Sequence, residues 1–148
     1  MSDRVSVSIT IGGDLAASAR DRFVAAIADE GLSVEWDGPD FDASMLPSDG
    51  GPLWLCAHEV AWGRLDDLEA LCVELGLPSA RWSGGYGRAW APERVVFTGS
   101  GAVVSYACDE DDRLTVDRGT VERLGTLAGV LARFDAADFV VPPLRLTG

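Results

Sequence analysis

Apolar residues occupy every second position from Val5 to Ile11, with serine or threonine between them. A period of two is typical of a strand that buries one face. The same alternation recurs at residues 32–36, and an apolar run at 53–60 predicts a third strand. A fourth, short strand is expected at 80–82.

Two helices are predicted between these strands, because apolar residues recur three and four positions apart. The first spans residues 15–30 and is followed by Gly31, and the second spans 64–75 and is followed by Gly76. Glycine after a helix supplies the left-handed conformation that ends it. The resulting order, β-α-β followed by β-α-β, predicts a ferredoxin-like βαββαβ core over residues 4–83.

The rest of the chain, residues 93–141, predicts an elaboration of that core. A Thr-Gly-Ser-Gly sequence at 98–101 is typical of a hairpin turn between two strands. The expected elements are strands at 94–97, 103–107 and 114–116, a helix from 117 to 134 and a strand at 139–141. We therefore predict one α+β domain over residues 1–148, in which a C-terminal β-meander and a third helix pack on a mostly antiparallel sheet.

Charge is distributed unevenly along the chain, whose formal net charge is −12 and which contains no lysine. The acidic stretch, residues 23–63, holds no arginine, and its carboxylates are Asp29, Glu30, Glu35, Asp37, Asp40, Asp42, Asp49 and Glu59. Such a stretch projects negative potential unless distant arginines fold over it. This argues against direct binding of nucleic acid or of an anionic membrane, and it favours a basic protein surface as the partner.

The first candidate site is the long irregular segment at residues 37–49. A calcium loop starting at Asp40 would need glycine at its sixth position and glutamate at its twelfth, where the chain has Met45 and Gly51. Two interpretations stay open: a solvated turn built from Asp side chains, or an acidic surface with apolar anchors that binds a partner. The candidate binding residues are Asp37, Asp40, Phe41, Asp42, Met45 and Asp49.

Cys56 and His58 are the weak candidates for catalysis. They are two residues apart on a predicted strand and therefore share a face. A thiol nucleophile also needs a base and an orienting group, and we favour the interpretation in which Cys56 is a small buried residue. The three cysteines lack the close pairs of a zinc site, so neither a metal nor a cofactor is expected.

The third candidate is a glycine-rich segment with interleaved aromatic residues. Its side chains could contact a ligand or a partner, or they could anchor a linker to the core. A phosphate-binding loop is excluded because it would need lysine. The residues concerned are Trp82, Tyr86, Arg88 and Trp90.

Together these patterns predict a non-catalytic protein-interaction module that engages a basic protein through its carboxylates, for example as a regulator or inhibitor of a nucleic-acid-binding protein. The alternative is an enzyme or small-molecule-binding domain that uses the sheet face around Cys56 and His58 and the loop at 84–90. A homodimer is a further possibility. The polar N-terminus and the lack of an apolar run of about 20 residues predict a cytoplasmic location.

Overall fold

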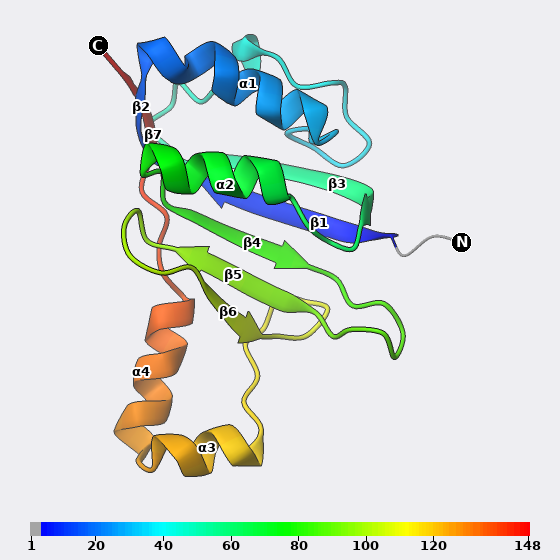
Figure 1. Ribbon diagram of the computed structural model, residues 1–148, viewed down its shortest axis with the longest axis vertical. Coiled ribbons are helices and arrows are strands. Elements are labelled where there is room, and N and C mark those ends of the chain that lie inside the picture. Colours follow the sequence, from blue (N-terminus) through cyan, green and yellow to red (C-terminus); the bar gives the residue numbers. More distant parts are fainter. Residues whose placement is uncertain (1–3) are drawn as a thin grey trace.

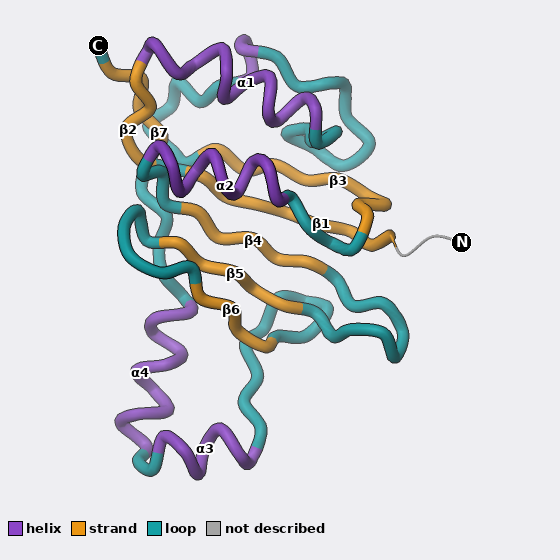
Figure 2. The backbone as a smooth tube through the Cα atoms, in the orientation of Figure 1, coloured by secondary structure: helices purple, strands orange, loops and turns teal. Residues whose placement is uncertain are grey.

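Five strands form one antiparallel sheet in the order β3-β1-β4-β5-β6 (Figures 1 and 2). The structure is a computed structural model that describes residues 4–148. The predicted mixed α and β architecture with a mostly antiparallel sheet is confirmed. The strands are β1 Arg4–Ile11, β3 Leu53–Ala61, β4 Ser79–Ser83, β5 Glu93–Phe97 and β6 Val104–Ala107.

One face of the sheet is covered by helices α1 (Arg20–Asp29) and α2 (Asp66–Leu75) (Figure 1). Three odd-numbered residues of β1, Val7, Ile9 and Ile11, point toward these helices and are buried with Phe23 and Ile27 of α1. Each fully buried side chain of this size contributes about 1.5–3 kcal/mol. The alternation in the sequence thus identified the buried face of β1 correctly.

The strand predicted at residues 32–36 is wrong, because only a single bridge between Ser33 and Cys56 forms there. Asp37 then adopts a left-handed φ of 58°, which turns the chain. Pro39 follows and has no N–H for a strand ladder. The segment continues as loop, with one short 3-10 turn, η2 (Ala43–Met45), before β3 begins.

Two short strands that the sequence did not reveal, β2 (Gly13–Ala16) and β7 (Leu144–Thr147), pair in parallel. The helix start predicted at residue 15 is therefore wrong, since α1 begins at Arg20. The strand predicted at 139–141 is also absent, and β7 lies just beyond it. The C-terminal segment thus returns to the beginning of the chain and extends the core formed by residues 4–83.

The C-terminal segment packs so closely on Gly12 that any larger residue at this position should destabilise the protein. A Cβ atom at Gly12 would lie 1.7 Å from the backbone oxygen of Pro142. Gly12→Ala should therefore displace the C-terminal segment and lower the free energy of unfolding by about 1–3 kcal/mol, measured by urea denaturation. Gly119→Ala is the control, because the atom nearest to a Cβ there, an Asp117 carboxylate oxygen, would be at 3.7 Å. Equal stability of the two variants would contradict this packing.

The single third helix predicted from residue 117 to 134 is instead two helices, α3 (Arg118–Leu124) and α4 (Leu127–Ala137). Gly125 adopts a left-handed φ of 76° and ends α3. The hydroxyl of Thr126 then accepts a hydrogen bond from the N–H of Gly129 and starts α4. A glycine with a cap directly after it separates the two helices.

The predicted packing of this third helix along the sheet is also wrong. Leu127 and Leu131, which such packing would bury, are 73% and 52% exposed. Only the end of α4 reaches the sheet, where Ala137 packs with Val96 and Tyr106. Figure 1 shows α3 and α4 extending beyond the edge of the sheet that β6 forms. In residues 4–148, no helix has the length and apolar character needed to cross a membrane.

Candidate functional site

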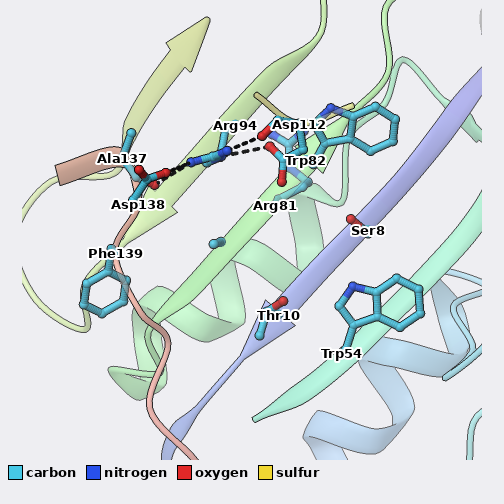
Figure 3. A pocket seen from close by; sticks show the side chains of 11 residues that line it. Ser8, Thr10, Trp54, Arg81, Trp82, Arg94, Asp112, Ala137, Asp138 and Phe139 are labelled. Carbon is cyan, nitrogen blue, oxygen red and sulfur yellow. Dashed lines mark hydrogen bonds and ion pairs between the residues drawn. The ribbon is translucent and has the colours of Figure 1, made fainter. Parts of the chain in front are cut away.

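The sheet face opposite α1 and α2 carries polar and aromatic side chains. The register places Thr10 of β1 beside Trp54 of β3, and Ser8 of β1 beside Trp82 of β4. With Phe139 they line a hollow of about 290 Å³, here called the sheet-face hollow (Figure 3). Its floor is the hydroxyl-bearing face of β1, and aromatic rings stand around it.

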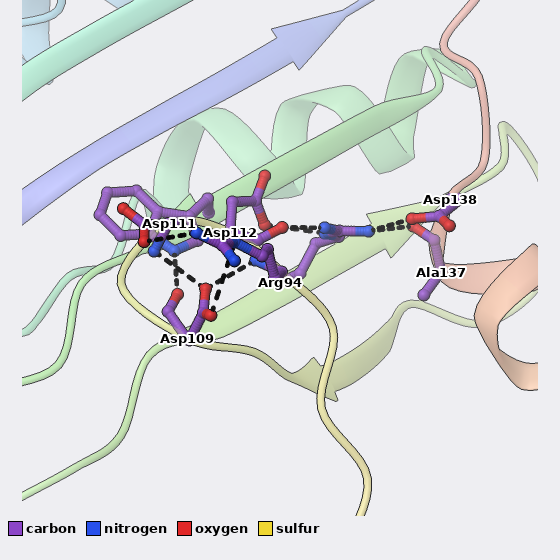
Figure 4. A network of polar contacts seen from close by, with 8 residues as sticks. Arg94, Asp109, Asp111, Asp112, Ala137 and Asp138 are labelled. Atoms are coloured by element: carbon purple, nitrogen blue, oxygen red, sulfur yellow. Dashed lines mark hydrogen bonds and ion pairs between the residues drawn. The ribbon is translucent and has the colours of Figure 1, made fainter.

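One wall of the sheet-face hollow is an ion-paired arginine. Arg94 donates to carboxylate oxygens of Asp112 and Asp138, each at 2.8 Å, and to the backbone oxygen of Ala137 at 3.0 Å (Figure 4). A further guanidinium nitrogen donates to the backbone oxygen of Asp112. These contacts compensate the charge of Arg94, so it is a structural tie between β5, the loop after β6 and the end of α4.

A second group of aromatic rings lies at the edge of the sheet. Trp36 stacks on His58 with ring centroids 4.6 Å apart and meets Trp54 edge-on at 5.9 Å. Trp36 and Trp54 are 41% and 40% exposed. We call these two residues the tryptophan pair. Sequence reasoning missed it, although the shared face of Trp54 and His58 on β3 was a signal.

The surroundings of Cys56 do not favour a nucleophile. Burial raises the pKa of the Cys56 thiol, and the negative charges of Asp37 and Glu35 raise it further. Burial likewise raises the pKa of Cys72 to about 12 and that of Cys108 to about 11. Because the thiolate is the reactive species, all three thiols are poor nucleophiles at neutral pH.

His58 interacts with Ser6 and Asp37. Its Nδ1 lies 3.0 Å from the hydroxyl oxygen of Ser6, and its Nε2 lies 3.8 Å from a carboxylate oxygen of Asp37. Ser6, His58 and Asp37 thus lie in the order of a nucleophile, a general base and an orienting acid. The 3.8 Å between His58 and Asp37 is too long for a hydrogen bond, so the carboxylate orients the imidazole only weakly. In the enzyme alternative, Ser6 therefore replaces Cys56 as the candidate nucleophile beside His58.

Some residues of the predicted binding loop at 37–49 belong to the hydrophobic core, and others form turns. Phe41 is buried in the core and Met45 packs against it, so their predicted role as exposed anchors is corrected. Asp42 accepts hydrogen bonds from the hydroxyl and N–H of Ser44, which lower its pKa. Asp49 accepts one from Gly51. The Asx-turn interpretation therefore describes part of this loop.

The remaining predicted carboxylates, Asp37 and Asp40, are exposed. The arginines that could have neutralised the acidic stretch have partners elsewhere: Arg81 pairs with Glu69 and Glu93, and Arg94 with Asp112 and Asp138. Among residues 4–148, no arginine forms an ion pair with a carboxylate of the acidic stretch. The carboxylates of the stretch other than Glu30 are therefore exposed without an arginine ion pair within that range. Two arginines do lie beside it: Arg4 donates to the backbone oxygen of Glu59, and Arg64 lines a hollow with Glu30 and Glu59.

Glu30 is the carboxylate of the acidic stretch whose surroundings disfavour its charged form. Burial raises its pKa most, and the nearby Asp67, Asp66 and Glu69 raise it further, although the N–H of Leu68 donates to it. Its Oε2 atom is buried and has no hydrogen-bond partner. Ionisation of Glu30 therefore costs the folded state free energy.

Glu30→Gln should accordingly stabilise the protein at pH 7 by up to about 1 kcal/mol. A carboxyl whose folded pKa is raised favours folding when protonated, and this contribution is lost as pH rises from the unfolded pKa through the folded one. The gain should therefore vanish near pH 4, which urea unfolding at both pH values would show. Asp29→Asn, an exposed neighbour, is the control. A gain that persists undiminished at pH 4 would contradict this assignment.

The residues of the third candidate site do not all lie together in the structure. Trp82 lines the sheet-face hollow, and its indole N–H donates to the backbone oxygen of Asp109 at 3.1 Å. Tyr86 stacks on Trp90, which also meets Trp62 with centroids 5.6 Å apart. Arg88 is exposed. Trp62 was not among the predicted residues, because it precedes this segment by about 20 positions in the chain.

The geometry offers two candidate surfaces that share Trp54: the tryptophan pair within the acidic stretch, and the sheet-face hollow. In the part of the chain that the structure describes, no group of three His, Cys, Asp or Glu residues could hold a metal ion. Comparisons with protein-family models, with curated proteins and with solved structures find no match to this chain.

Proposed function

We propose that this protein is an interaction module that binds a basic protein surface through its acidic stretch. The observation that supports this most is the absence, within residues 4–148, of any arginine paired with those carboxylates. Uncompensated charge of one sign accelerates association with a partner of opposite charge and orients the docking. A partner that itself binds nucleic acid would present such a basic surface, and the module would then act as its regulator or inhibitor.

The tryptophan pair provides the apolar anchors of this interaction in place of Phe41 and Met45. Glu35 and Asp37 flank Trp36 in the sequence, and both are exposed. An exposed indole attracts a cation over its face, and a neighbouring carboxylate adds a charge-assisted hydrogen bond. The combination suits a guanidinium or ammonium group on the partner, with arginine preferred for its flat shape.

We also infer that the scaffold is a ferredoxin-like core whose second strand is reduced to one bridge. Three observations support this inference: the strand order β3-β1-β4, the two helices on one face, and the Ser33–Cys56 bridge on the outer side of β3. Loss of that strand leaves the edge of β3 beside the acidic stretch. The scaffold thus explains why the charged segment lies along a sheet edge rather than under a helix.

Removing charge from the exposed part of the stretch tests the proposed function. The triple variant Glu35→Gln, Asp37→Asn, Asp40→Asn should weaken binding of an arginine-rich decapeptide about ten-fold at low salt, measured by fluorescence anisotropy. At about 0.5 M salt the variant and the wild type should converge, because exposed charges are then screened.

A matched control removes the same number of charges from the other end of the molecule: Asp111→Asn, Glu122→Gln, Asp135→Asn, all exposed residues. This control should bind the peptide like the wild type. An equal loss in both triple variants would mean that only net charge matters, and affinity indifferent to salt would remove the electrostatic basis of the proposal.

A further inference from the structure

We propose that the sheet-face hollow binds one ring of an uncharged saccharide. Its floor consists of Ser8 and Thr10, which lie on the open face of a strand in the interior of the sheet. Within residues 4–148, neither hydroxyl forms a hydrogen bond to another protein group. Both hydroxyls can therefore donate to and accept from a ligand.

The walls of the hollow are spaced for a ring. Trp54 and Trp82 stand on the two strands that flank β1. Neighbouring strands lie about 4.8 Å apart, and Trp54 and Trp82 are offset by two residues along β1, so the Cα atoms that carry the two indoles are about 12 Å apart. Only small side chains lie between them. Figure 3 shows Ser8 between these two tryptophans and Thr10 beside Trp54. A ring in contact with an indole at about 3.5–4 Å fits above this floor.

The polar groups of the hollow match the edge of a sugar rather than a purely apolar molecule. A pyranose has C–H faces that pack on an indole and hydroxyls around its rim that both donate and accept. Asp112 and Asp138 line the same hollow, and their carboxylates can accept hydrogen bonds from such hydroxyls. Trp82 is oriented by its hydrogen bond to Asp109. A fully apolar ligand would bury the two hydroxyls without partners, which costs free energy.

Charge excludes phosphorylated ligands from this hollow. Arg94 is the arginine whose guanidinium lines the wall, and its nitrogens already donate to Asp112, Ala137 and Asp138. The net charge of −12 further opposes an anion. The occupant is therefore neutral, and its recognition does not depend on the carboxylates of the acidic stretch.

Indole N–H signals in two-dimensional NMR spectra test this site directly. Methyl β-glucoside, N-acetylglucosamine and their β-1,4-linked dimers are titrated into the protein, with adenosine and AMP as comparison ligands. At least one saccharide should shift the signals of Trp54 and Trp82 with a Kd of about 1 mM, and the signals of Trp62 and Trp90 should stay in place. No shift with any saccharide, or tighter binding of adenosine, overturns the proposal.

The double variant Ser8→Ala, Thr10→Val keeps the shape of the floor and removes its hydroxyls. It should weaken saccharide binding about five- to ten-fold, while Trp62→Phe, outside the hollow, should leave binding unchanged. Unchanged affinity in the double variant overturns the assignment of the floor. The triple charge variant of the acidic stretch should retain saccharide binding, so failure of this proposal and failure of the proposed function are separate results.

Discussion

Replacing Arg81 with methionine is expected to lower the free energy of unfolding by about 3–5 kcal/mol. Arg81 is buried, donates to a carboxylate oxygen of Glu69 at 2.6 Å and to the backbone oxygen of Gly63 at 2.7 Å, and also contacts the Ser83 hydroxyl. Methionine fills a similar space but offers no donor. The carboxylate of Glu69 would then be buried without its charge partner.

The pKa of Glu69 gives this loss a dependence on pH. Burial already raises the pKa of Glu69, although the charge and hydrogen bond of Arg81 lower it. Without Arg81 the pKa should rise further, and the protonated carboxyl would be favoured in the fold. A raised folded pKa means that stability is present at low pH and lost as pH rises. Arg81→Met should therefore be less harmful near pH 4 than at pH 7.

A double-mutant cycle separates the ion pair from general damage. Arg81→Met combined with Glu69→Leu should recover most of the lost stability, because neither charge is then buried alone. Arg22→Met is the surface control: its bidentate pair with Glu74 is exposed and should cost below about 1 kcal/mol. Urea denaturation of these variants measures the effects. A cost for Arg81→Met no larger than that of Arg22→Met would contradict the buried network.

The second large effect is expected at Arg94, whose replacement by methionine should cost about 2–4 kcal/mol. Arg94 connects β5 to Asp112 and to the C-terminal end of α4 at Ala137 and Asp138 (Figure 4). Only this end of α4 packs on the sheet. Loss of the tie should therefore loosen α3 and α4 before the sheet unfolds.

Hydrogen exchange distinguishes this local effect from global destabilisation. In Arg94→Met, the amides of residues 118–137 should exchange faster than in the wild type. The amides of β1 should still exchange only through global unfolding. Arg118→Met, whose side chain is 92% exposed in its pair with Glu122, should change neither. Uniform loss of protection across the protein would show that Arg94 does not act as a local tie.

The sequence alone determined the elements whose signal is local. The alternation around Ile9 predicted β1 and its buried face, the apolar spacing with Gly76 predicted α2 and its end, and a glycine-rich turn predicted the β5-β6 hairpin. Each of these features depends on residues within one turn or one strand. The acidic stretch was likewise visible as a run of charges, and within residues 4–148 none of its carboxylates forms an ion pair with an arginine.

Only the tertiary structure decided which elements lie against each other. Ser33 and its neighbours have the alternation of a strand, yet pairing stops at one bridge because Asp37 and Pro39 turn the chain away. Trp36 and Trp54 form a pair, Arg81 finds Glu69, and the C-terminal strand joins β2 across most of the chain. Periodicity reports which side of an element is buried, whereas the partner of that side depends on chain reversals and packing over long separations. For this reason both candidate surfaces emerged only from the fold.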